Sequence, residues 1–172
     1  MRRAFAVLVL LSMALCAPAG RAPAEERKDA LRPCTPADLI GAWEVIRFGT
    51  ARAVAVDPSN PSFYPHQRYV FAANATVRHL TSRTKITPAD HRALLAATAP
   101  ATWAVDGTGK LLVQQEGATR LETAACAVLT TKVVDPRSRV PAMPGDLLLT
   151  HYDAVDRPVM RRQLRKLDRL AE

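Results

Sequence analysis

Aromatic residues are scarce in this sequence, at 5% of its 172 residues, and they do not alternate with the basic ones. A surface that binds single-stranded nucleic acid combines the two residue types, because successive bases stack on aromatic rings beside charged groups. We therefore expect no nucleic-acid partner, although the formal net charge is +8. The scarcity also leaves two alternatives for the interior, which is either filled by its own side chains or has room for a ligand.

The chain also lacks the common motifs of catalysis and metal binding. It contains no Gly-x-Ser-x-Gly, no glycine-rich phosphate loop, no His-x-His and no His-Glu-x-x-His. Its histidines, His66, His79, His91 and His151, are far apart in the sequence. We predict no enzyme, no metal site and no cofactor. An enzyme would need a polar cluster in the interior, for which His79, His151 and Tyr69 are the first candidates.

Long apolar runs are absent except at the start of the chain. A positive residue cluster at 1–3 precedes an apolar run over residues 4–17, and small residues flank cleavage positions after Ala19 and Ala24. This order is that of a secretory signal peptide, and the run is too short to span a membrane as a helix. We predict a signal peptide over residues 1–24, a leader over 25–37, one domain over 38–168, and no transmembrane segment in the mature chain.

The predicted export implies a periplasmic or secreted protein, and the Arg-, Ala- and Pro-rich composition is typical of a bacterial one. Cys16 raises lipidation as an alternative. Leu15, however, stands where a lipoprotein needs a small residue.

Cysteine is sparse, and only Cys34 and Cys126 remain after the signal peptide. An even pair in an oxidising compartment predicts one disulfide. Closing so long a loop is worth roughly 4 kcal/mol in the loop-entropy model. Two free thiols or a fragment of a metal site are the alternatives, but neither cysteine has a second Cys or His at ligand spacing.

Short strands are indicated along most of the remaining chain. The first covers residues 39–48, after a helical turn that begins at Thr35. A hairpin follows over 67–73 and 76–82, with Asn74 suited to a left-handed turn position. Later strands are predicted over residues 102–105, 110–115, 119–134 (one bent strand or two short ones), 145–152 and 159–166.

Two further segments separate these strands. Thr87 and Asp90 predict a capped helix over 88–98 that buries Leu94 and Leu95. Residues 49–66 are rich in turn formers and predict a long loop, either a lid with Phe63 and Tyr64 as an apolar flap or a simple surface loop.

About eight strands joined mostly by tight turns predict an all-β fold. The pattern suits a sandwich or a barrel, and closure into a barrel removes exposed strand edges. We predict a small antiparallel up-and-down barrel with one short helix inserted mid-chain.

The Gly41-x-Trp43 pair on the first strand, the strand meander and Arg162 on the last strand resemble the lipocalins and the wider lipocalin-like families of calycin-type barrels. The resemblance implies that Trp43 closes one end of the barrel and that Arg162 packs across its ring as a cation–π contact.

A barrel of this size can hold one small ligand in its interior. We predict an exported protein that binds or carries a small apolar ligand. The candidate ligand-binding residues are Trp43, Val45, Tyr69, Phe71, Trp103, Val113 and Leu149. The alternative is a periplasmic protein–protein interaction module, an inhibitor or envelope accessory factor, with a filled core and a protein partner that the sequence does not identify.

Overall fold

A single antiparallel sheet that closes on itself dominates the computed structural model, which describes residues 30–119, 121–134, 138 and 140–170. The elements in chain order are β1 (Leu31–Pro33), α1 (Pro36–Leu39), β2 (Gly41–Thr50), η1 (Pro61–Phe63), β3 (His66–Phe71), β4 (Thr76–Ser82), α2 (Pro88–Ala96), β5 (Ala101–Val105), β6 (Lys110–Gln115), β7 (Leu121–Leu129), β8 (Leu147–Tyr152), β9 (Pro158–Lys166) and η2 (Leu167–Arg169).

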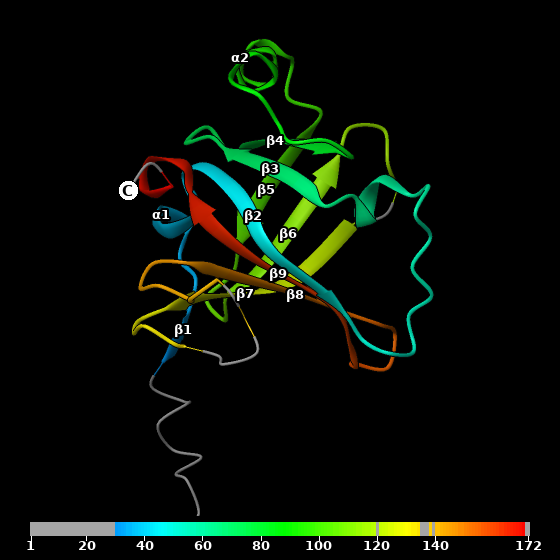
Figure 1. Cartoon of the computed structure of the whole chain (residues 1–172). Helices are drawn as coiled ribbons and strands as arrows, with labels where there is room; N and C mark the ends of the chain where they lie inside the picture. The colour runs from blue at the N-terminus through cyan, green and yellow to red at the C-terminus, as the bar shows by residue number, and fades with distance from the viewer. Residues whose placement is uncertain (1–29, 120, 135–137, 139, 171–172) are drawn as a thin grey trace, which may run out of the picture.

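Strands β2 to β9 pair in the order of the chain, each antiparallel to the next, and β9 returns to pair with β2 (Figure 1). The register of that closing pair places Val45 opposite Leu164. The result is a closed, eight-stranded up-and-down barrel, which confirms the predicted fold class. Closure pairs both edges of every barrel strand over at least part of its length, which removes the free edges that favour aggregation.

Part of the predicted leader over residues 25–37 forms regular structure. Leu31–Pro33 forms β1, an extra strand that pairs with β7, where Leu31 lies opposite Leu129. The side chains of β1 are exposed, so the strand carries no hydrophobic pattern in the sequence, and it depends on backbone pairing with a distant segment. The predicted signal peptide, its cleavage positions and Cys16 lie outside the described residues.

The predicted helical turn is present as α1. The backbone N–H and the hydroxyl of Thr35 both donate to Asp38, at 2.8 and 2.7 Å. The carbonyl of Leu39 at the end of α1 accepts a hydrogen bond of 2.7 Å from the indole N–H of Trp43. Gly41, between them, has a φ of +135°, which side-chain-bearing residues rarely adopt. The Gly-x-Trp pair therefore marks a bend in the backbone between α1 and β2. The bend allows the Trp43 side chain to reach the end of α1.

The predicted disulfide joins Cys34 to Cys126, 92 residues apart in the sequence. Both residues are buried, and the bridge connects the segment between β1 and α1 to the middle of β7. We call the end of the barrel formed by α1, Trp43 and this disulfide the closed end. Leu39, Trp43, Leu147 and Leu164, each at most 1% exposed, form its core.

Helix α2 lies outside the barrel wall, beyond β4 (Figure 1). Its predicted cap is present, since the Thr87 N–H donates to Asp90 at 2.8 Å and the Asp90 N–H donates to the Thr87 hydroxyl at 3.2 Å. Leu94 is buried as predicted, but Leu95 is 48% exposed and that prediction was wrong. One side of the helix faces the barrel, so the neighbouring leucine points away from it.

The structure also decides two details that concern residues 119–134 and the β3–β4 turn. Residues 119–134 contain one long strand, β7, rather than two short ones. In the β3–β4 turn the left-handed residue is Ala75, with a φ of 60°, and not Asn74. Asn74 instead accepts hydrogen bonds from the backbone N–H and the hydroxyl of Thr76. Among the described helices, none combines the length and the apolar character that crossing a bilayer requires.

Candidate functional site: a cavity inside the barrel

A cavity of about 280 Å³ lies inside the barrel, away from the closed end. Its wall is mixed, because aliphatic and aromatic side chains share it almost equally with polar and charged ones. The lining residues are Ser62, Tyr69, Phe71, Val77, His79, Pro100, Ala101, Leu111, Val113, Gln115, Glu122, Thr123, Ala124, Leu149, His151 and Arg162.

Four of the seven predicted ligand-binding residues line this cavity, namely Tyr69, Phe71, Val113 and Leu149. The other three, Trp43, Val45 and Trp103, do not line it and belong to the packed core. The sequence predicts which strand face points inward, but position along the strand decides whether an inward side chain meets the core or the cavity.

Arg162 on β9 is the most unusual residue of the site, because a cation that is only 3% exposed faces the barrel interior. Its Nε donates to Gln67 Oε1 at 2.9 Å, and its Nη2 donates to the carbonyl of Ser62 at 3.1 Å. Its Nη1 lies 2.8 Å from His151 Nε2. None of the described carboxylates forms an ion pair with this guanidinium.

The predicted contact between Arg162 and Trp43 is replaced by two others. The ammonium of Lys166 lies 5.3 Å from the Trp43 ring, and the guanidinium of Arg162 lies 5.7 Å from the ring of Phe48. Register explains the exchange, because β2 and β9 place Trp43 opposite Lys166 and Phe48 opposite Arg162. Lys166 is thus the cation that covers Trp43 at the closed end, and Arg162 lines the cavity instead.

Histidine 151 is neutral and oriented by two contacts. A guanidinium can only donate hydrogen bonds, so His151 Nε2 accepts from Arg162 and the ring proton is on Nδ1, toward the backbone of Thr123. Desolvation by burial, and then the charge of Arg162, lower the pKa of His151 to about 4, against an opposing effect of the Thr123 hydrogen bond. At neutral pH this imidazole adds no charge to the cavity.

Tyr69 and His79, from paired strands β3 and β4, stack their rings with centroids 4.0 Å apart. Although part of the His79 side chain is exposed, desolvation by the barrel wall and then the charge of Arg162 lower the pKa of His79 below its usual range. Burial raises the pKa of Tyr69, so its phenol is neutral as well. The residues considered first for an enzyme therefore do line the same cavity, and all three are uncharged at neutral pH.

Glu122 is the one acidic residue among those that line the cavity. Its Oε1 accepts a hydrogen bond of 2.9 Å from Gln115 Nε2, on the neighbouring strand β6. The side chain of Glu122 is exposed, whereas Arg162 is buried, so water can solvate the acid but not the base.

The long loop before β3 reaches the cavity through its backbone. The carbonyl of Ser62, in η1, accepts from both Arg162 and Gln67, and Gln67 also donates to the carbonyl of Tyr64 at 2.9 Å. Phe63 packs edge-on against Phe48 with centroids 6.1 Å apart. Phe63 and Tyr64 themselves do not line the cavity, so the loop contacts it by Ser62 rather than by the predicted apolar flap.

Strands β4 and β5 have the shortest pairing of the barrel. Their register holds only two residue pairs, Thr76 with Thr102 and Val77 with Ala101, and α2 is inserted between the two strands. Val77, His79 and Ala101 line the cavity on this side. The cavity therefore lies beside the part of the barrel wall with the fewest paired residues.

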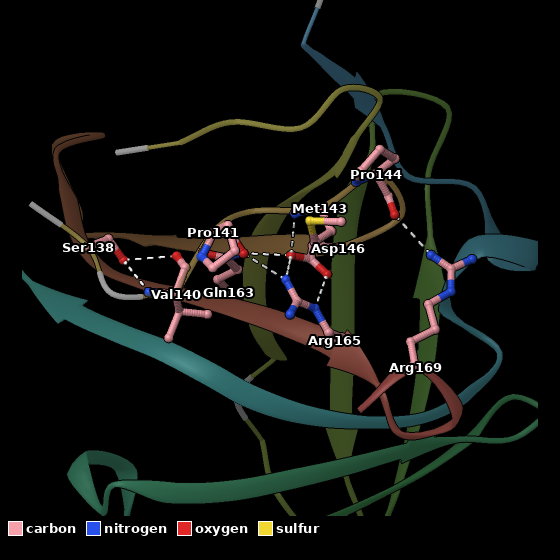
Figure 2. A network of polar contacts seen from close by, with 9 residues as sticks. All are labelled: Ser138, Val140, Pro141, Met143, Pro144, Asp146, Gln163, Arg165 and Arg169. Atoms are coloured by element: carbon pink, nitrogen blue, oxygen red, sulfur yellow. Dashed lines mark hydrogen bonds and ion pairs between the residues drawn. The ribbon is translucent and has the colours of Figure 1, made fainter. Parts of the chain in front are cut away.

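A second arginine of β9, Arg165, differs from Arg162 because a carboxylate compensates its charge (Figure 2). Arg165 donates from Nε and Nη2 to the two oxygens of Asp146, at 2.9 and 2.8 Å. Asp146 is 1% exposed and also accepts from the side chain of Gln163 and the backbone N–H of Met143. These contacts attach the segment that precedes β8 to the last strand.

Gln67 and Arg162 are the members of the site whose roles sequence analysis missed. Gln67 falls on the same alternating face of β3 as Tyr69 and Phe71, so period-two alternation could have placed it inside the barrel. The resemblance to lipocalins singled out Arg162 as a partner of Trp43, but nothing in the local sequence distinguishes this cavity-lining arginine from the exposed Arg161 beside it.

No group of three His, Cys, Asp or Glu side chains in the described part of the chain is arranged to hold a metal ion. The chain matches no protein-family model, no curated protein and no solved structure. The geometry of the cavity is therefore the basis on which a function can be proposed.

Proposed function

We propose that this protein is an exported, lipocalin-like carrier that binds a small, mainly apolar molecule inside its barrel. The observation that carries the proposal is the cavity of about 280 Å³, half of whose lining residues are apolar. Ligand sites in proteins are concave, mostly apolar and equipped with a small number of polar groups, and small β-barrels hold single ligands in this way. The apolar part of this wall includes Phe71, Val77, Leu111, Val113 and Leu149.

The cavity supports a carrier over the interaction module, because the module was expected to have a filled core. Export is part of the proposal and is supported by the signal-like pattern of residues 1–24 and by the Cys34–Cys126 bridge, since disulfides persist in oxidising compartments.

Cavity size restricts the ligand. One water occupies about 30 Å³ of liquid, so this cavity corresponds to roughly nine waters and to a ligand of about ten non-hydrogen atoms. A medium-length alkyl chain or a single aromatic ring with a short side chain has this size.

Calorimetric titration with octan-1-ol tests the proposal. The wild-type protein should bind the alcohol, and Val113→Phe should weaken binding by about tenfold or more, because the ring occupies volume that the ligand needs. Leu112→Phe is the matched control. Leu112 is the next residue on β6 and points to the opposite face, so this variant should bind like the wild type.

Failure of the wild-type protein to bind octan-1-ol would overturn the proposal. So would equal binding by wild type and Val113→Phe, provided that circular dichroism shows both to be folded.

A further inference from the structure

The polar partners of Arg162 are all neutral. An amide oxygen, an imidazole nitrogen and a backbone carbonyl accept its hydrogen bonds, and no carboxylate among the described residues forms an ion pair with it. Moving a cation out of water is expensive unless an opposite charge compensates it. The protein thus maintains an uncompensated positive charge at the wall of its cavity.

The Arg162 guanidinium is also fixed by three hydrogen bonds that do not use all of its N–H groups. Gln67 Oε1, His151 Nε2 and the Ser62 carbonyl use one N–H each on Nε, Nη1 and Nη2. A guanidinium has five N–H groups, so one remains on Nη1 and one on Nη2. These two nitrogens form the fork that binds both oxygens of a carboxylate.

The other groups of the cavity favour an anion with a single charge. His79, His151 and Tyr69 are neutral at neutral pH and do not compete with Arg162 for it. Glu122, which water can solvate, adds repulsion with each further negative charge on a ligand, and the apolar part of the wall disfavours a strongly hydrated anion. A hydrocarbon body with one terminal carboxylate satisfies both conditions.

We propose that the ligand is a small monocarboxylic acid whose carboxylate pairs with Arg162 while its hydrocarbon part occupies the apolar cavity. This inference rests on the proposed function and specifies its substrate class. Gln67, His151 and Ser62 act as positioning groups, since they fix the plane of the guanidinium before the ligand arrives.

Calorimetry with octanoate and octanamide tests this inference on the folded protein. The two compounds have the same chain length and number of non-hydrogen atoms, and at about pH 7.5 only octanoate is charged. The wild-type protein should bind octanoate about tenfold more tightly than octanamide, because hydrogen bonds to a charged group are stronger than neutral ones.

Three variants assign the preference to one residue. Arg162→Met should abolish the preference and still bind octanamide, and Arg162→Lys should keep a smaller preference, because lysine retains the charge without the fork. Arg161→Met is the matched control. Its side chain leaves the opposite face of β9, where it donates to the Thr150 hydroxyl, so removing its charge should preserve the preference.

The outcomes separate this inference from the proposed function. Equal binding of octanoate and octanamide by the wild type, or an unchanged preference in Arg162→Met, overturns the carboxylate inference and leaves the carrier proposal standing. Binding of neither compound overturns both. If Arg162→Met does not fold, the wild-type comparison and Arg162→Lys still decide the question.

Discussion

Arg162 and Arg165 lie three residues apart on β9 and have opposite surroundings. Arg165 leaves the outer face and pairs with the buried carboxylate of Asp146 through two hydrogen bonds. Arg162 enters the barrel and finds only neutral acceptors. One residue type therefore serves as a structural clamp where its charge is compensated, and marks a candidate binding site where its charge is not.

The same difference separates the two halves of the barrel. The closed end combines the disulfide, α1 and a tryptophan whose indole N–H donates to a backbone carbonyl. The other half contains the cavity, the short β4–β5 pairing and polar side chains that face inward. We infer that the closed end contributes more to stability than the half with the cavity.

The largest expected effect comes from removing the compensating charge of the clamp. Asp146→Asn should lower the free energy of unfolding by about 3 kcal/mol, because it leaves the Arg165 guanidinium without its carboxylate in a largely buried site. Urea denaturation followed by circular dichroism measures this change.

Asp153→Asn is the control for that measurement. Asp153 pairs with Arg157, whose side chain is 75% exposed, and surface pairs contribute at most about 1 kcal/mol. Equal losses in the two variants would contradict the distinction between a buried clamp and a surface pair.

An intermediate loss of stability is expected at low pH, through protonation of His151 in the cavity half of the barrel. The pKa of His151 is about 4 in the folded protein and about 6.5 in an unfolded chain, so the unfolded state binds more protons between these values. Its stability contribution is complete above pH 6.5 and is lost as the pH falls toward 4. Between about pH 7 and pH 5 the wild type should lose on the order of 1 kcal/mol more than His151→Gln.

Glutamine can still accept from Arg162, which limits other changes in this variant. Glu122, Tyr69 and His79 line the same cavity in both proteins, so the difference between the two pH profiles isolates residue 151. Identical profiles from urea denaturation at each pH would show that His151 is not a buried neutral group.

The smallest effect should come from the uncompensated arginine. Arg162→Met should change the free energy of unfolding by less than about 1 kcal/mol, because relief from burying the charge offsets the lost hydrogen bonds. A loss as large as that of Asp146→Asn in the same denaturation assay would mean that Arg162 is a structural residue like Arg165.

Local patterns account for the parts of the fold that were predicted correctly. Alternation along β3 and β4 indicated the hairpin, and Thr87 with Asp90 indicated the start of α2, because these signals act within a few residues of each other. The Cys34–Cys126 bridge followed from counting cysteines. β1 was missed because its side chains are exposed and its stability comes from pairing with β7.

The site was only partly predictable for a related reason. Tyr69, Phe71, Val113 and Leu149 could be assigned to the inner face by alternation. Whether an inner residue lines the cavity depends on the stagger of neighbouring strands. The same stagger places Lys166 over Trp43, so Arg162 does not contact that ring and lines the cavity.

The sequence by itself determined the strand meander, the turns and caps, and the pair of cysteines, since each depends on residues near one another or on a simple count. Only the tertiary structure decided where the barrel interior forms a cavity, which arginine of β9 enters it and which one pairs with Asp146. Those outcomes depend on register between strands far apart in the chain, and no local interaction specifies that register.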